Sequence, residues 1–284
     1  MTDKNNKLCQ PCAVCGESQP QMFRIWFDDY IKLYRCKVCG FVSQFPGPGN
    51  YTIVTEYNDM YSLDFLKTGQ EFMYPKRRRV LQDIVDRITK YQATGKILDI
   101  GCGDGHFLYL SSKKGFNCYG VEESKKLSSY ASTKSGAKII QGAYNKSMFP
   151  ENFFDIISLI QVLEHIPTPI DALETVKYHL RPKGIMIIEV PSINAPNFLA
   201  YRFTRMNKLV KPPRGGVIYS HFGYYSPESL CILTRKCGFK KEELVTGRWQ
   251  YKYSGFLKII GQLLDPVFNS AKIGGILYIG RNEV

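Results

Sequence analysis

The chain lacks the hydrophobic stretches that would attach it to a membrane or export it. In its 284 residues no window approaches the roughly 18 consecutive apolar residues of a membrane-spanning helix. The opening residues, MTDKNNKLCQ, contain no apolar segment typical of a secretory signal. Internal repeats and low-complexity tracts are also absent. We therefore expect a globular protein located in the cytoplasm, with no transmembrane segment.

Acidic residues are scarce: 25 Asp and Glu stand against 38 Lys and Arg, so the formal net charge is +13. Such a surface suits phosphate-bearing partners, namely nucleic acid, an anionic membrane surface or a nucleotide-linked metabolite. The segment of about residues 191–227 has no acid, and within it a cation recurs at every third position from 202 to 214. Those cations are Arg202, Arg205, Lys208, Lys211 and Arg214. The segment is either a solvated helix face or a lid that binds a phosphate-bearing acceptor, because arginine matches phosphate geometry.

Nine cysteines without an export signal point to metal binding or redox work in a reducing compartment. Two CxVCG units share one pattern, since Gly16 and Gly40 follow them and glycine tolerates the positive φ of a metal-binding turn. We predict a four-thiolate zinc ribbon over residues 1–48. Its ligands are Cys12, Cys15, Cys36 and Cys39. Cys9 lacks a following glycine and is expected to stay outside the site.

Two alternatives to a zinc site are less favoured. Accidental buried cysteines would not repeat the same unit, and a redox pair would need only one CxxC beside a thioredoxin-like fold. Between the units, FRIWFDD and IKLYRC predict a β-hairpin. A segment of about 40 residues cannot be stabilised by apolar burial alone, so the zinc is expected to be structural.

A turn-rich stretch, FPGPGN, separates this ribbon from an aromatic and helical linker over residues 49–92. Within the linker an apolar stripe predicts an amphipathic helix. The stripe consists of Val80, Leu81, Ile84, Val85 and Ile88. The basic run KRRR at 76–79 fits a solvated helix face better than a binding site.

From residue 93 to 284, apolar strands alternate with helical segments. The expected strands are KILDI, NCYGVEES, KIIQG, FDIISLIQVL, GIMIIEV and GGILYIG, and PIDALETVKYHLRPKG is expected to be helical. This alternation predicts an α/β domain with a doubly wound, mostly parallel sheet.

A glycine-rich turn follows the first of these strands in ILDIGCGDG, residues 97–105. Its glycines are Gly101, Gly103 and Gly105. Glycines at this place let a ligand approach the backbone, and Glu122 at the next strand end can accept hydrogen bonds from ribose hydroxyls. NAD would satisfy the same logic. However, Asp99 and Asp104 beside the turn disfavour a pyrophosphate and favour a cationic ligand.

The segments ILDIGCGDGHF, YGVEES, FDIISLIQVLEHIP, LRPKGIMIIEVPS and ESLCILTRKCGF resemble class I S-adenosylmethionine-dependent methyltransferases in order and spacing, over about residues 95–284. The resemblance implies a Rossmann-like doubly wound sheet of seven strands that binds S-adenosylmethionine. Residues implied to bind it are Asp99, Gly101, Cys102, Gly103, Asp104, Gly105, Glu122 and Gln161. Ribbon, linker and core together resemble bacterial methyltransferases with an N-terminal zinc-binding segment, often found with glycan or sugar pathways.

One position departs from the family pattern. Where the family often has an acid that contacts the adenine amino group, this chain has Ala143. Adenine is therefore expected to be held by backbone, or by Tyr144 or Asn145.

Histidine is the expected base if the methyl acceptor is a hydroxyl, because its pKa lies near neutrality. His221, in YSHFGYYSPESL, is the preferred candidate, and His165, in VLEHIP, lies where the cleft of this fold opens. The EH pair is widespread in the family, so a structural role for His165 is equally open. His106 is expected to begin the helix after the glycine turn, and His179 is expected at the surface.

These observations favour methyl transfer to oxygen or carbon of a small metabolite that bears phosphate, such as a nucleotide-linked sugar or glycan precursor. The alternative is a zinc-ribbon RNA methyltransferase, favoured by the zinc site and the charge. Against it, QVLEHIP stands where base N-methylating enzymes have an Asn/Asp-Pro-Pro-aromatic turn. None of the core cysteines has the sequence context expected of the nucleophile that attacks C5 of a pyrimidine. These cysteines are Cys102, Cys118, Cys231 and Cys237. A catalytically inactive scaffold is least favoured. The segment 255–268 could form an amphipathic helix for a partner or for peripheral contact with a membrane surface, but such a segment more often packs on the sheet.

Overall fold

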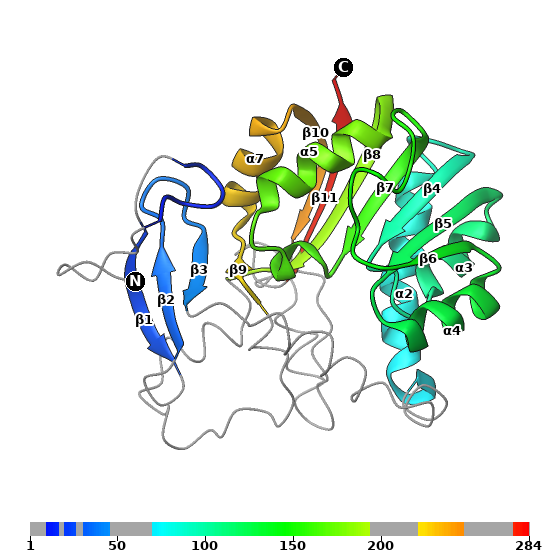
Figure 1. Cartoon of the computed structure of the whole chain (residues 1–284), viewed down its shortest axis with the longest axis horizontal. Coiled ribbons are helices and arrows are strands. Elements are labelled where there is room, and N and C mark those ends of the chain that lie inside the picture. The colour runs from blue at the N-terminus through cyan, green and yellow to red at the C-terminus, as the bar shows by residue number, and fades with distance from the viewer. Residues whose placement is uncertain are drawn as a thin grey trace, which may run out of the picture.

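A computed structural model describes most of the chain as two connected β-sheets with helices around the larger one (Figure 1). The described residues are 10–16, 20–26, 31–45, 70–193, 221–246 and 275–283. Cys9, the five cations of the expected lid and the segment 255–268 lie outside them. Within these described ranges, no helix combines the length and the apolar character needed to cross a membrane.

The larger sheet has seven strands in the order β10-β11-β8-β7-β4-β5-β6. Its strands are β4 (Gly95–Ile100), β5 (Phe116–Glu122), β6 (Lys138–Gln141), β7 (Phe154–Ile160), β8 (Leu180–Pro191), β10 (Phe239–Thr246) and β11 (Gly275–Asn282). The five strands from β8 to β6 run parallel, and β11 runs antiparallel to both of its neighbours. Strand order reverses between β4 and β7. Ligands of such sheets bind at this reversal, outside the carboxyl ends of the strands.

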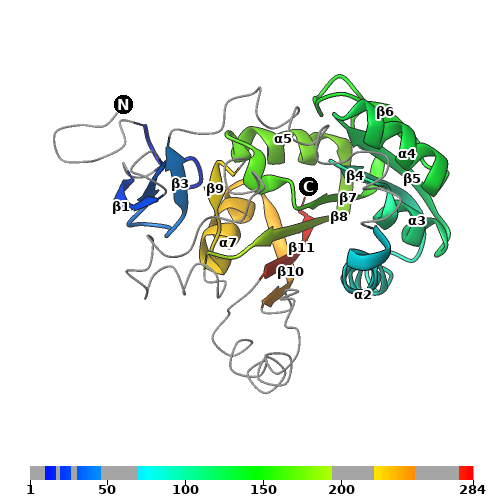
Figure 2. The same ribbon diagram turned by 90° about the horizontal axis from the view of Figure 1, so that it is seen from below.

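Helices cover both faces of this sheet, and Figure 2 shows the two layers. One layer holds α2 (Gln70–Ile88), α3 (His106–Ser112) and α4 (Lys125–Ser135), and the other holds α5 (Pro169–His179) and α7 (Pro227–Lys236). Consecutive residues of a strand pack against opposite layers. Ile97 of β4 packs in the cluster with α2 and α3, and Leu98 packs in the cluster with α5 and α7. Because alternate side chains of a strand face opposite ways, continuous apolar runs are required here. The predicted doubly wound α/β domain is confirmed.

The predicted amphipathic helix is α2, and its apolar stripe packs on the sheet. Leu81, Ile84, Val85 and Ile88 are all buried in one cluster with Ile97 of β4. In the basic run, Arg78 and Arg79 are exposed, as expected of a solvated face. Arg77 differs, because its Nη1 donates to Oε2 of the buried Glu189 on β8 at 3.1 Å. This ion pair ties α2 to the middle of the sheet.

The smaller sheet contains the predicted hairpin and a strand from far along the chain. Strands β1 (Gln21–Trp26), β2 (Ile31–Arg35) and β3 (Val42–Phe45) are antiparallel, which confirms the hairpin. The fourth strand is β9 (Gly223–Tyr224), which pairs with β3. The cysteine-bearing segment is therefore paired, through a backbone ladder, with a strand that lies far along the chain (Figure 1).

The expected helix PIDALETVKYHLRPKG is correct only as far as His179. Strand β8 begins at Leu180, and its register against β7 shifts between Phe154 and Ile156. Pro182 accounts for the early end, since proline has no amide hydrogen and disfavours helical geometry in the residue before it. The helix thus ends before the chain enters the sheet.

Candidate functional site

The glycine turn after β4 lies at the strand-order reversal and is open on one side. Gly103 has φ +54°, and a Cβ built on it would meet no atom of the described residues within 4 Å. Gly105 is different, since a Cβ there would lie 2.9 Å from Ala131 Cβ of α4. Gly103 therefore needs glycine for its backbone conformation, and its open side is where a ligand can reach the main chain.

Glu122, at the carboxyl end of β5, is held beside this turn. Its Oε2 accepts from the backbone N of Gly103, and its Oε1 accepts from the backbone N of Ser124, both at 2.9 Å. Burial raises the pKa of Glu122. Each carboxylate oxygen keeps a further lone pair, so the side chain can still accept from a ligand hydroxyl.

The two aspartates of the turn occupy different environments. Asp99 is buried within the sheet, its Oδ1 accepts from Ser158 Oγ at 2.7 Å, and burial raises its pKa to about 7. Asp104 lies in the turn itself, where its Oδ1 accepts from the backbone N of His106 at 3.0 Å. His106 begins α3, as expected, and burial lowers its pKa. Asp104 thus fixes the start of the helix, while Asp99 links β4 to β7.

The core cysteines are buried thiols without the properties of nucleophiles. Burial raises the pKa of Cys102 well above its usual range, that of Cys118 to about 12 and that of Cys237 to about 11. A reactive cysteine needs a lowered pKa to supply thiolate. Cys102 contributes instead through its backbone N, which donates to the Val121 carbonyl at 3.1 Å.

Gln161 follows β7 at the same edge of the sheet. Its φ of +60° is unusual for a residue other than glycine, and its backbone N donates to the Glu189 carbonyl at 2.8 Å. Residues held in this conformation often mark functional places, because surrounding contacts must overcome the backbone cost. The next residue, Val162, lies against the glycine turn, since a Cβ built on Gly101 would be 2.6 Å from Val162 Cγ2.

The two candidate bases, His165 and His221, come together although they are far apart in sequence. His165 belongs to the short helix η2 (Leu163–His165) after β7, and the two ring centroids lie 4.7 Å apart. The backbone N of Phe222 donates to the Glu164 carbonyl at 2.8 Å, which holds the two segments together. The predicted pair therefore shares one place at the carboxyl edge of the sheet.

Electrostatics distinguishes the members of this group. Burial, with a smaller contribution from the charge of His165, lowers the pKa of His221 to about 3, so this ring is neutral near pH 7. Burial raises the pKa of Glu164 to about 8. Glu164 is a site residue that was not predicted from the sequence. Its position beside His165, at the end of an apolar strand, could have indicated that it belongs to the site.

His179 is buried, so the prediction that it lies at the surface is wrong. Its Nε2 lies 3.1 Å from the Lys146 carbonyl, and the Tyr144 hydroxyl lies 2.6 Å from its Nδ1. An Nε2–H that donates to the carbonyl leaves Nδ1 to accept from Tyr144. Asn145 is also engaged locally, since its Nδ2 donates to the Ala143 carbonyl at 3.0 Å. Adenine contacts from Tyr144 or Asn145 stay a prediction.

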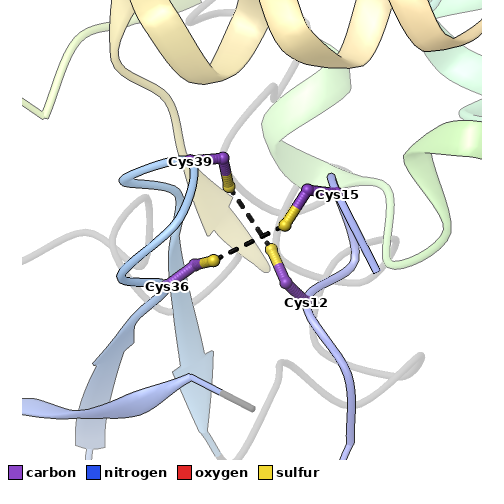
Figure 3. Close-up of side chains that lie close together, drawn as sticks. All are labelled: Cys12, Cys15, Cys36 and Cys39. Carbon is purple, nitrogen blue, oxygen red and sulfur yellow. Dashed lines mark hydrogen bonds between the residues drawn. The ribbon is translucent and has the colours of Figure 1, made fainter. Parts of the chain in front are cut away.

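The four predicted metal ligands converge on one point (Figure 3). All four thiols are buried and lie within 4.8 Å of one another, with Cys12 Sγ 3.5 Å from Cys39 Sγ and Cys15 Sγ 3.6 Å from Cys36 Sγ. Thiolates at about 2.3 Å from a tetrahedral zinc ion lie roughly 3.8 Å apart, so the arrangement fits zinc.

Both cysteine turns have the same backbone geometry. The amide of Gly16 donates to the Cys12 carbonyl at 2.8 Å, and that of Gly40 to the Cys36 carbonyl at 3.0 Å. The two glycines have φ values of +74° and +75°. Glycine in the left-handed region turns each chain back over the sulfur pair. The repeated CxVCG pattern is therefore explained by two matching turns.

The cysteine-bearing sheet contacts the site through several bonds. Backbone N of Gln44 in β3 donates to the Phe222 carbonyl at 3.0 Å, and Phe222 in turn bonds to Glu164. The Tyr224 hydroxyl donates to Gln44 Oε1 at 3.0 Å, and the rings of Phe41 and Tyr225 lie 5.0 Å apart. A continuous path of hydrogen bonds thus connects β3 to the helix that carries Glu164 and His165.

Curated relatives match the central part of the chain. A ubiquinone biosynthesis O-methyltransferase of Thiobacillus denitrificans is 27% identical over 155 residues, which cover 52% of this chain and 66% of the relative. A protein of the same description from Hydrogenovibrio crunogenus is 26% identical over 154 residues, covering 51% and 63%. The chain spans just under two thirds of the length of these relatives.

Solved structures show the same fold at low sequence identity. A SAM-dependent methyltransferase of Archaeoglobus fulgidus has a TM-score of 0.52 at 16% identity, covering 74% of this chain and 99% of its own. A 1,6-didemethyltoxoflavin-N1-methyltransferase of Burkholderia thailandensis, solved with S-adenosylhomocysteine, has a TM-score of 0.53 at 14% identity, covering 91% and 98%. These likenesses concern the fold alone.

A family model described as a methyltransferase domain matches residues 73–244, which is more than half of the chain. The matched range begins within α2 and ends within β10, so it includes the glycine turn, Glu122, Gln161 and the Glu164–His165 pair. The expectation of a methyltransferase is confirmed: this chain belongs to the methyltransferase domain family.

Proposed function

We propose that the chain transfers a methyl group from S-adenosylmethionine to a hydroxyl oxygen of a small molecule. The observation that carries this proposal is the open glycine turn bridged to Glu122, at the strand-order reversal of a methyltransferase domain. Glycine leaves the main chain of the turn accessible to a ligand, and the carboxylate of Glu122 beside it has lone pairs that can accept from hydroxyls. This combination suits a ligand with a ribose. S-adenosylmethionine supplies the methyl group as a sulfonium.

The residues of the turn have distinct proposed roles toward this cofactor. Glu122 accepts from the ribose hydroxyls, and the backbone from Gly101 to Gly105 borders the amino-acid end. Asp104 gives the turn a negative potential that favours a cationic ligand over a pyrophosphate, and Asp99 adds to it only where it is ionised, above its pKa of about 7. Cys102 contributes backbone, and Gln161 borders the cofactor from the end of β7. Asp99 acts from within the sheet, because its carboxyl is buried against Ser158.

The acceptor is proposed to lie at the carboxyl end of β7, near His165 and His221. Methyl transfer is an in-line displacement, so the chain mainly orients the acceptor and excludes water. His165 is the better candidate for receiving the hydroxyl proton, because the pKa of His221 is lowered to about 3. His221 is proposed to orient the acceptor as a neutral imidazole.

The relatives support oxygen over carbon as the acceptor atom, since both are described as O-methyltransferases. They give no support to a nucleotide-linked sugar or glycan precursor, which is retained only as one class of phosphate-bearing acceptor to test. RNA is the less favoured acceptor. Peripheral membrane contact and location in the cytoplasm stay predictions.

We also propose that Cys12, Cys15, Cys36 and Cys39 bind a structural zinc ion within a ribbon of residues 1–48. The linker of 49–92 and a methyltransferase domain of 93–284, with a lid near 191–227, complete the proposed organisation. The sulfur geometry and the paired glycine turns support the zinc ion. The ladder between β3 and β9 supports a role in holding the acceptor side of the site.

Calorimetry with S-adenosylmethionine tests the cofactor site. Glu122→Ala removes the ribose acceptor and the bond to Gly103, so we expect the dissociation constant to rise at least tenfold, about 1.4 kcal/mol. Glu123→Ala, an exposed acid at the adjacent position, is the matched control and should bind like the parent chain. Equal affinities of the two variants would contradict the proposed site.

A further inference from the structure

A second group of metal-ligand side chains lies apart from the four cysteines. It consists of Glu164, His165 and His221, whose carboxylate and imidazole ligand atoms all lie within 4.8 Å of one another. Glu164 and His221 are buried, at 1% and 8% exposure. The first two residues follow β7 and the third precedes β9, so the fold brings together donors that are distant in sequence.

The carboxylate of Glu164 lacks the partners that a buried acid needs. Neither Oε1 nor Oε2 has a hydrogen-bond partner among the described residues, and the same is true of His221 Nδ1. His165 Nε2 lies 4.0 Å from Oε1, which is too long for a hydrogen bond. Burying a carboxylate without a partner is costly, and buried acids are normally paired or bound to a metal ion.

We propose that Glu164, His165 and His221 bind a divalent transition-metal ion. Two imidazoles and one carboxylate form a donor set that holds ions such as Zn²⁺, Fe²⁺ or Co²⁺ and leaves coordination positions open. Mg²⁺ and Ca²⁺ prefer oxygen ligands and fit this set poorly. The ion would satisfy both the unpartnered carboxylate and the ring nitrogen of His221.

Backbone hydrogen bonds hold the segments of the three ligands in place. His165 N donates to the Val162 carbonyl at 2.9 Å, which closes the η2 turn. Phe222 N donates to the Glu164 carbonyl, and the Phe222 carbonyl accepts from Gln44 N of β3. His221 is therefore fixed against η2 by its neighbour in sequence. Fixed ligands reduce the ordering cost of metal binding.

The place of this site suggests which ligand completes it. It lies at the carboxyl end of β7, the strand next to β4 and its glycine turn. An open position on the ion would bind an oxygen of the acceptor, which favours small molecules with a hydroxyl and a neighbouring second oxygen. With the ion bound, His165 would act as a ligand and the ion would lower the pKa of the acceptor hydroxyl, so His165 would be the proton acceptor only in the metal-free chain. This role rests on the proposed function, whereas metal binding itself does not.

Titration with Co²⁺ tests the site in the full chain with zinc on its cysteines. We expect one further equivalent of Co²⁺ to bind, with weak visible absorption and no intense thiolate charge-transfer band. Glu164→Gln and His221→Gln keep side-chain size and should weaken this binding at least tenfold. His179→Gln is the control, because that buried histidine already bonds to Tyr144 and Lys146.

Circular dichroism establishes that each variant is folded before it is titrated. Absence of a second equivalent in the parent chain would overturn the proposal, as would parent-like Co²⁺ binding by folded Glu164→Gln. Absorption dominated by thiolate bands would also overturn it, since Co²⁺ would then occupy the cysteines. If Co²⁺ binds as expected but the chain transfers no methyl group to any hydroxyl, the metal site stands and the proposed function falls.

Discussion

The residues at the glycine turn contribute in different ways, some through backbone geometry and others through a charged side chain. Gly103 leaves the main chain open to a ligand, whereas Glu122 fixes that main chain by a hydrogen bond. Asp99 stays within the sheet, bonded to Ser158. Substitutions at these positions should therefore separate effects on cofactor binding from effects on stability.

Gly103→Ala should impair cofactor binding far more than it impairs folding. An alanine at its φ of +54° costs about 1 kcal/mol in stability, and its methyl group would enter the open side of the turn. Gly136→Ala is a matched control, because Gly136 ends α4 with φ +67° and a Cβ built on it likewise meets nothing within 4 Å in the part of the chain that the structure describes. Urea unfolding should show similar losses for both, while calorimetry should show at least a tenfold weaker cofactor only for Gly103→Ala, about 1.4 kcal/mol. Parent-like affinity would argue against a ligand at this turn.

Asp99→Asn should stabilise the chain increasingly as pH rises. Burial raises the pKa of Asp99 to about 7, so the folded chain keeps this proton where the unfolded chain, with a pKa near 4, has lost it. The folded state then binds more protons, and stability falls as pH rises from about 4 to about 7. Asparagine removes this loss and can still accept from Ser158. In urea unfolding without cofactor, the variant's advantage should grow across this window to at most about 4 kcal/mol; a constant difference would contradict the assignment.

At the scale of elements, the contact between β3 and β9 links the cysteine turns to the site. Gln44 of β3 bonds to Phe222, and Phe222 bonds to Glu164 in η2. Phe41, two residues after Cys39, packs on Tyr225. Because β9 has only two residues, its position depends on the strand it pairs with.

Removing the metal from the cysteines should loosen this contact and spare the cofactor turn. Cys12→Ser or a chelator should reduce hydrogen-exchange protection of the Gln44 and Phe222 amides, since small metal-binding segments depend on the ion for stability. The Gly103 amide should keep its protection. Cys231→Ser changes a cysteine outside the cluster and is the control. Unchanged protection at Phe222 in a metal-free chain would show that the ribbon does not hold β9.

Over the whole molecule, the sequence predicts the larger sheet well and the connection between the sheets poorly. Parallel strands buried on both faces need continuous apolar runs, so β4, β7 and β8 are visible as such. By contrast, β10 (FKKEELVT) has a mostly polar sequence because it is an edge strand with much of its length exposed. Strand β9 is too short for any periodicity, so its pairing with β3 follows only from tertiary structure.

The candidate site likewise has features that the sequence predicts and features that depend on tertiary contacts. The glycine turn, Glu122 and the four cysteines are predictable, because each requires a particular residue type at a particular spacing. The burial of His179 is not predictable, since it depends on Tyr144 and on aromatic neighbours such as Phe149. The meeting of His165 with His221 depends likewise on the backbone bond from Phe222 to Glu164.

The central claim is methyl transfer from S-adenosylmethionine to a hydroxyl of a small molecule. Its most direct test incubates the purified chain with S-adenosylmethionine carrying a deuterated methyl group and a panel of hydroxylated metabolites, including catechols and nucleotide-linked sugars, with RNA as a further substrate. With S-adenosylmethionine below the parent chain's dissociation constant, mass spectrometry should detect the deuterated methyl group on an acceptor oxygen with the parent chain and with Glu123→Ala, and at least tenfold less of it with Glu122→Ala. Label on carbon or on RNA, or equal transfer by Glu122→Ala, would contradict the account.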